Sequence, residues 1–176
     1  MRKALVVMLA VAWLSPVSTL ADDDNDHGHT LVKFKGGIGV IPVSSGVGTA
    51  ATAEVVNRNI VRTVQPPGQI WVIAALDAKV SDDGHIRVKG RGLLLGGGNA
   101  IGGNANASVF ATLICEAAAP FTLRNTNLAG VPLEPNGDFR IDDFLDQPTA
   151  ECASPVLLIR NANNGSWFAA GIPDRD

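Results

Sequence analysis

The residues with the clearest capacity for chemistry are cations that alternate along two neighbouring segments. Residues 70–80 and 86–91 each resemble one strand, and the Asp82-Asp83-Gly84 sequence between them is typical of a hairpin loop ending on glycine. This loop would pair Val80 with Ile86, so that the polar residues of both strands share the opposite face. That face would carry a basic stripe, opposed only by Asp77, which consists of Lys79, His85, Arg87, Lys89 and Arg91.

The basic stripe has two interpretations. Lys79 would lie directly opposite Arg87, and such like charges repel unless an anion or solvent relieves them. The stripe could therefore bind an anionic polysaccharide, a phosphate or an envelope surface, or it could be a solvated face that discourages pairing with other chains. The formal net charge of −3 gives no indication of a nucleic-acid partner.

Paired carboxylates are the second chemical feature. Pro135-Asn136-Gly137 is typical of a three-residue loop, and it would set Glu134 opposite Asp138 in a hairpin of residues 131–141. Carboxylates about 5 Å apart serve retaining glycosidases, with the pKa of one raised by the other. They could equally bind calcium or form only a solvated rim. The nearby acidic residues are Asp142, Asp143, Asp146 and Glu151.

Other catalytic chemistry finds little support in the sequence. His85 is the one histidine after residue 29, and no Gly-x-Ser-x-Gly motif accompanies it, which argues against a nucleophile–histidine–carboxylate triad. We find no three convergent ligands for a metal-dependent hydrolase. Trp71 and Trp167 lie in strand-like runs, so we expect them in the core rather than beneath a bound sugar.

The segment of residues 22–30 is acidic and predicted to be disordered. It offers a possible site for a divalent metal, and no other cofactor is expected. Carboxylates there suit calcium, and the histidine pair suits zinc, copper or nickel. The spacing misses that of a calcium loop, because Gly28 takes the seventh position when Asp22 is counted as the first, and the loop needs glycine at the sixth. The candidate ligands are Asp22, Asp24, Asp26, His27 and His29.

The N-terminus predicts export. A charged start, an apolar run over residues 4–14 and a cleavage site at Thr19-Leu20-Ala21 are typical of a signal peptide over residues 1–21. Its removal takes the formal charge to about −5, because Arg2 and Lys3 are lost. No later stretch is long and apolar enough to span a membrane as a helix. We therefore expect a secreted protein, extracellular or periplasmic, with a single domain over residues 31–176.

The two cysteines and the short apolar runs predict the fold. Cys115 and Cys152 are expected to form a disulfide, because paired cysteines in an exported chain are usually bridged. Residues 156–159 and 167–170 would form a third hairpin. Residues 50–64 favour strand over helix through their β-branched side chains, whereas residues 142–146 are predicted to form one helical turn.

These features predict an all-β fold: an antiparallel β-sandwich or flattened barrel of about eight to ten short strands with one disulfide. Self-assembly through exposed sheet edges stays open. Two functions follow from the candidate sites. The first is a non-catalytic extracellular or cell-envelope domain that binds an anionic partner through the basic stripe. The alternative is a carbohydrate-active hydrolase that uses the paired carboxylates near residues 134–146.

Overall fold

A computed structural model describes residues 28–47 and 55–174. The signal-peptide prediction and the metal candidates Asp22, Asp24, Asp26 and His27 lie outside these residues. The described part contains no helix, and hence none that could span a membrane. Its strands are β1 (Thr30–Gly39), β2 (Val43–Val47), β3 (Val55–Arg58), β4 (Trp71–Val72), β5 (Ala75–Ser81), β6 (His85–Arg91), β7 (Leu94–Leu95), β8 (Ser108–Ile114), β9 (Arg124–Asn125), β10 (Val131–Pro132), β11 (Phe139–Phe144), β12 (Val156–Asn161) and β13 (Trp167–Pro173).

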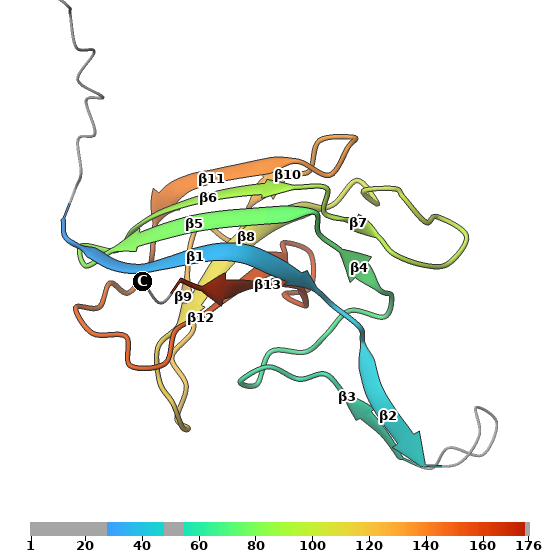
Figure 1. The fold of residues 1–176 in the computed structure, drawn as a ribbon, viewed down its shortest axis with the longest axis horizontal. Coiled ribbons are helices and arrows are strands. Elements are labelled where there is room, and N and C mark those ends of the chain that lie inside the picture. The colour runs from blue at the N-terminus through green and yellow to red at the C-terminus, as the bar shows by residue number, and fades with distance from the viewer. Residues whose placement is uncertain (1–27, 48–54, 175–176) are drawn as a thin grey trace, which may run out of the picture.

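Nine of these strands form one antiparallel sheet. Their order is β10–β8–β12–β13–β1–β5–β6–β11, and β9 pairs with β8 outside this path. The sheet curls into two layers, with β11, β6, β5 and β1 in one and β8, β12 and β13 in the other (Figure 1). Its two end strands, β10 and β11, are joined by the short loop of residues 133–138, so the sheet nearly closes into a flattened barrel. The predicted all-β fold is confirmed.

Two smaller pairs of strands stand outside this sheet. Strands β2 and β3 pair with each other and project from one end of the barrel (Figure 1), and β4 pairs with β7. Of the strand predicted over residues 50–64, residues 55–58 form β3, whereas residues 59–64 contain a turn closed by a bridge between Val61 and Val64, and residues 50–54 lie outside the described part.

The core lies between the two layers, because alternate residues of each strand point inward. One inward row crosses four strands, pairing Phe34 with Ala78, Ala78 with Val88 and Val88 with Ile141. All four residues are buried. The opposite layer contributes fully buried aliphatic side chains, among them Leu113, Leu157 and Ile159. Burial of these rows is the main term that holds the two layers together.

Both tryptophans of the described chain belong to the interior, as expected. Trp71 is 4% exposed and stacks on Phe168 with ring centroids 3.9 Å apart. Trp167 is 3% exposed, and its indole Nε1–H donates a hydrogen bond to the carbonyl of Asn59 at 2.9 Å. This bond satisfies the polar edge of a buried ring.

The predicted hairpin of β5 and β6 is confirmed in register, with Val80 opposite Ile86 and Asp77 opposite Lys89. The third hairpin is also present as β12 and β13. The prediction of one continuous strand over residues 70–80 is wrong, because β4 separates from β5 and pairs with β7. Gly39 accounts for the break: a Cβ there would lie 2.2 Å from the Trp71 carbonyl oxygen, so the chain crosses the end of β1 at close range.

The hairpin predicted over residues 131–141 is confirmed only at its loop. The Glu134 N–H donates to the Asp138 carbonyl at 2.9 Å, and Gly137 has the predicted positive φ of 81°. Beyond the loop the strands diverge, and the predicted pairing of Val131 with Ile141 is wrong. Val131 pairs with Val109 of β8, and Ile141 pairs with Val88 of β6. Each strand completes one end of the sheet, so the loop closes the barrel.

The helical turn predicted over residues 142–146 is wrong as well. Asp142, Asp143 and Phe144 continue β11 and pair with Arg87, Ile86 and His85 of β6. A strand is favoured here because Asp142 then lies directly opposite a cation, and opposite charges on paired strands stabilise each other.

The predicted disulfide between Cys115 and Cys152 is present. It joins the end of β8 to the loop before β12, and it is compatible with an oxidising extracellular environment. Arg62 supports the same joint without a covalent bond. Its guanidinium donates to the carbonyls of Ile114 at 3.0 Å and of Ser154 at 2.6 Å.

A partly buried ion pair beside this joint gives a pH-dependent prediction. The Arg124 Nη2 lies 2.9 Å from Glu116 Oε1, and this hydrogen bond is the main reason that the pKa of Glu116 falls to about 2. A carboxyl with a lowered pKa stabilises the fold above its ordinary pKa of 4.5, and this contribution is lost as the pH falls toward 2. We expect Glu116→Gln to lower the free energy of unfolding by about 1–2 kcal/mol at pH 7.

Urea unfolding of Glu116→Gln and the parent protein across this pH range measures the effect, and their difference should vanish near pH 2. Glu151→Gln, at an exposed position, is the control and should have little effect at any pH. A difference that does not change between pH 7 and the acid limit would contradict the assignment to the ionised carboxylate.

Candidate functional site

The outer side of the layer formed by β1, β5, β6 and β11 gathers cations from all four strands. The register places Lys33 beside Lys79 and Lys79 beside Arg87 in one row. Lys35, Asp77, Lys89 and Arg140 form the next row. We call this surface the basic face, and its cations are Lys33, Lys35, Lys79, Arg87, Lys89, Arg91 and Arg140.

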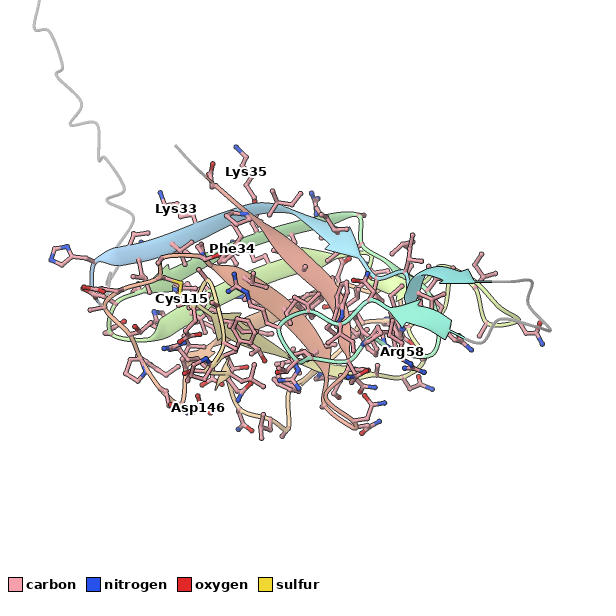
Figure 2. All side chains as sticks on the ribbon, turned by 90° about the horizontal axis from the view of Figure 1, so that it is seen from below. Lys33, Phe34, Lys35, Arg58, Cys115 and Asp146 are labelled. Atoms are coloured by element: carbon pink, nitrogen blue, oxygen red, sulfur yellow. A yellow bond between two sulfur atoms is a disulfide. The ribbon has the colours of Figure 1, made fainter. Side chains whose placement is uncertain are left out.

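Strand geometry explains why these side chains point away from the core. Lys33 and Lys35 alternate with Phe34 in β1, so the buried phenylalanine turns both lysines outward. Figure 2 shows the two lysines projecting from the barrel, with Phe34 on the inner side of the strand. Every lysine after Lys3 lies on the basic face, which concentrates positive charge in a chain of formal charge −3.

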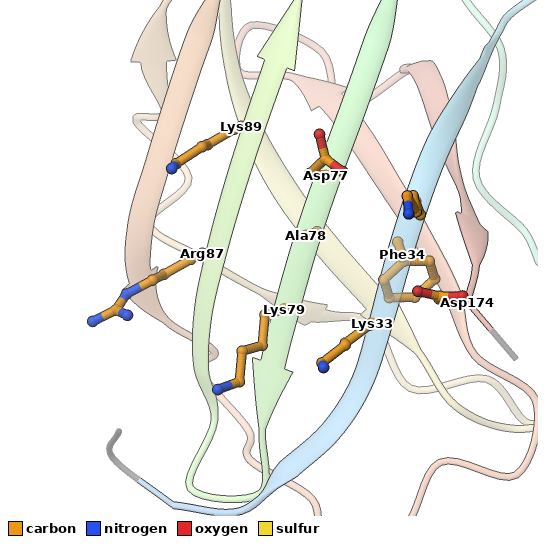
Figure 3. A pocket seen from close by; sticks show the side chains of 9 residues that line it. Lys33, Phe34, Asp77, Ala78, Lys79, Arg87, Lys89 and Asp174 are labelled. Carbon is orange, nitrogen blue, oxygen red and sulfur yellow. The ribbon is translucent and has the colours of Figure 1, made fainter. Parts of the chain in front are cut away.

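A shallow hollow of about 410 Å³ lies over β1 and β5 on this face. Figure 3 shows its side chains, with Lys33, Lys79 and Arg87 crossing the three strands and Lys89 beside Asp77. Five of its lining residues are cations and two, Asp77 and Asp174, are carboxylates. The hollow is therefore open, positively charged and suited to an anion rather than to an enclosed small molecule.

His85 was predicted to belong to the basic stripe, and the structure places it at one end of the face. Its side chain is 10% exposed, and its Nε2 lies 2.7 Å from Asp142 Oδ1. The ring also contacts Phe144, with centroids 4.9 Å apart. The pKa of Asp142 is lowered mainly by this hydrogen bond and further by Arg87. His85 thus orients a carboxylate and is not among the residues that line the hollow.

The carboxylates proposed for catalysis do not gather at one place: Asp142 and Asp143 line a hollow of about 260 Å³, but Glu134 and Asp138 are not among its lining residues. Asp138 Oδ1 accepts a hydrogen bond from the Gly92 N–H at 3.0 Å. Asp143 Oδ2 accepts from the Asn127 N–H and Asp146 Oδ1 from the Asn125 N–H, both at 2.8 Å. These bonds tie residues 143–146 to the loops beside β9 and so bridge the two ends of the sheet. Glu134 is exposed at the loop.

His29 is the one metal candidate that lies in the described part of the chain. His29 is exposed, and its main chain exchanges two hydrogen bonds of 2.9 Å with Asp82. Residues 28–47 and 55–174 contain no group of three or more His, Cys, Asp or Glu that could hold a metal ion.

Sequence reasoning missed three cations of the basic face: Lys33, Lys35 and Arg140. The alternation around Phe34 was a usable signal for Lys33 and Lys35, because it sets both on the polar side of a strand. Nothing local indicated that β1 would pair with β5, since the strands are far apart in sequence. Arg140 lies in the hairpin predicted over residues 131–141, and its place beside Lys89 depends on the pairing of β11 with β6.

The fold and this face define a class of protein: an all-β, disulfide-bonded domain with a nearly closed barrel and one basic outer surface. Comparisons with family models, curated proteins and solved structures found no match to the chain. Its function is therefore inferred from the geometry and charge of this chain alone.

Proposed function

We propose that this protein is a secreted, non-catalytic β-domain of the extracellular space or cell envelope that binds an acidic polysaccharide on its basic face. The observation that carries the proposal is the meeting of cations from four adjacent strands on one surface of a chain with a negative formal charge. Secretion is supported by the disulfide, which is compatible with an oxidising environment.

The spacing of the cations suits a polymer better than a single small anion. Neighbouring strands lie about 4.8 Å apart, and alternate residues along one strand lie about 7 Å apart. The basic face is thus a grid of charges, and an extended chain of carboxylates or sulfates can contact several of them together. Each exposed ion pair is weak, so affinity accumulates over the grid and falls with salt.

The hydrolase alternative has less support. A catalytic pair needs two carboxyl groups that face a common substrate, whereas Asp138 is held by the Gly92 main chain. Full retention of any hydrolytic activity in a Glu134→Gln, Asp138→Asn double variant would exclude this pair as its source.

Charge reversal tests the proposed binding surface. Lys35 and Arg58 are both exposed, and Figure 2 shows them far apart on the molecule. We expect Lys35→Glu to weaken binding to immobilised polygalacturonate, because each reversal removes one attraction and adds one repulsion. Reversing Lys33, Lys35 and Lys89 together should weaken binding at least about tenfold and flatten its dependence on salt.

Arg58→Glu is the matched control, since it changes the net charge by the same amount away from the basic face. Uncharged dextran serves as the polymer control. Equal affinities for Lys35→Glu and Arg58→Glu would contradict the assignment to this face, and equal binding to dextran would contradict the anionic ligand.

A further inference from the structure

Arg160, in β12, is a half-buried cation that has only neutral partners in the described part of the chain. Its Nε–H donates to the Gly165 carbonyl at 2.7 Å. Its Nη1 lies 3.3 Å from Thr112 Oγ1 and 3.4 Å from Asn125 Oδ1. The guanidinium carbon is 5.1 Å from the centre of the Phe110 ring. Burial lowers the pKa of this arginine, which shows that its charge is partly removed from water.

The guanidinium borders a hollow of about 510 Å³ between the β12–β13 loop and the segment around β9. The residues that line this hollow include no aspartate or glutamate. Its polar side chains are Arg160, Asn125, Asn163 and Asn164, and Leu123 and Leu128 add apolar surface. Leu128 is 58% exposed, so apolar surface beside the cation is open to a ligand.

The hydrogen bonds of Arg160 and Asn164 leave donors of both side chains without a partner among the described residues. Asn164 Oδ1 accepts from the Ser166 N–H at 3.0 Å and from the Ser166 hydroxyl at 2.7 Å. Its NH₂ group is therefore the half of the amide that remains for a ligand. No bond from Arg160 Nη2 to another described residue is present, so two guanidinium N–H groups also remain.

The nearest carboxylate in this network does not reach the arginine. Asp146 Oδ2 lies 3.3 Å from Asn125 Nδ2, and the same Asn125 amide turns its oxygen toward Arg160. Asn125 Oδ1 also accepts from the Thr112 hydroxyl at 2.8 Å, which fixes the orientation of the amide. The arginine thus lacks a direct ionic partner, and a half-buried charge without one is stabilised by any anion that can enter.

We propose that this hollow binds a carboxylate with an attached apolar group. The carboxylate accepts hydrogen bonds from Arg160 Nη2 and the Asn164 amide, and the apolar group lies against Leu123 and Leu128. Free organic acids and the C-terminus of a peptide share this chemistry. The site is independent of the basic face, because β12 lies in the other layer of the barrel (Figure 1).

Calorimetric titration of the mature, oxidised protein tests the site with four probes: N-acetyl-leucinate, its neutral amide, inorganic phosphate, and an acetylated alanine tripeptide extended by a C-terminal leucine. We expect saturable binding of both carboxylates and at least about tenfold weaker binding of the amide, since charge-assisted hydrogen bonds are lost. The tighter of the two carboxylates identifies the source as a free acid or a chain end.

Two variants locate the binding. Arg160→Gln should abolish it, and Leu128→Glu should weaken it at least about tenfold by placing a competing carboxylate beside the guanidinium. Leu128 is exposed, so this variant should fold even if Arg160→Gln does not, and Leu128→Gln is its neutral control. The proposal is overturned if neither carboxylate binds, if acid and amide bind equally, if phosphate binds more tightly, or if Leu128→Glu binds like Leu128→Gln.

Discussion

Replacing Cys115 and Cys152 together by alanine should lower the free energy of unfolding by about 4 kcal/mol. The bridge closes a loop of 37 residues, and in the chain-entropy model such a crosslink restricts the unfolded chain by about this amount. The loop contains β9, β10 and β11. Without the bridge, the segment that gains conformational freedom on unfolding therefore includes both end strands of the barrel sheet. Urea unfolding of the variant and the oxidised parent at neutral pH gives the difference directly.

The reduced parent protein is the control for this experiment. It retains both thiol side chains in a partly buried joint, so it should unfold close to the double alanine variant if the crosslink itself supplies the stability. An oxidised parent that unfolds with the same midpoint as the reduced one would show that the bridge adds nothing. In that case the hydrogen bonds of Arg62 to Ile114 and Ser154 would be the main interactions that hold the end of β8 to the loop before β12.

Gly137→Ala should lower the free energy of unfolding by about 2–4 kcal/mol. The residue has a φ of 81°, which disfavours any side chain, and a Cβ there would lie 2.6 Å from both the nitrogen and the oxygen of Leu93. The main chains are close because the Leu93 N–H donates to the Gly137 carbonyl at 2.9 Å. A shift at this position would displace the loop that joins the two ends of the sheet.

Gly102→Ala is the matched control, because Gly102 has a φ of 80° but no atom within 4 Å of a Cβ. It should show only the conformational part of the effect, about 1–2 kcal/mol. Chemical unfolding of both variants separates backbone strain from the contact with Leu93. Equal losses of unfolding free energy would mean that the loop of residues 134–138 can move away from Leu93 without any further loss of stability.

Local chemistry in the sequence determined two turns and the strands of one hairpin. Asp82-Asp83-Gly84 and Pro135-Asn136-Gly137 both place glycine where the chain needs a positive φ, and both loops form as predicted. The alternation on either side of the first loop gives the register of β5 and β6, because the apolar partners must share one face. The cysteine pair and the two core tryptophans follow from the same kind of argument.

The sequence also gave part of the basic face, since Lys79, Arg87, Lys89 and Arg91 alternate within one hairpin. It could not supply Lys33 and Lys35, because a strand pattern does not identify the strand beside it. Arg160 was not recognised at all. Its separation from Asp146 depends on Asn125, which reaches the hollow from a distant segment of the chain.

Tertiary structure decided which strands are neighbours, and the loop of residues 134–138 shows why. Turn chemistry fixes the residues next to a turn, so Glu134 meets Asp138 as predicted. Farther along, Val131 and Ile141 each have a choice of partner, and pairing with Val109 and Val88 completes two ends of a large sheet and covers the core. Apolar burial over the whole barrel stabilises the fold more than a two-stranded ladder of a few residues would. No local sequence pattern predicts the outcome of that competition.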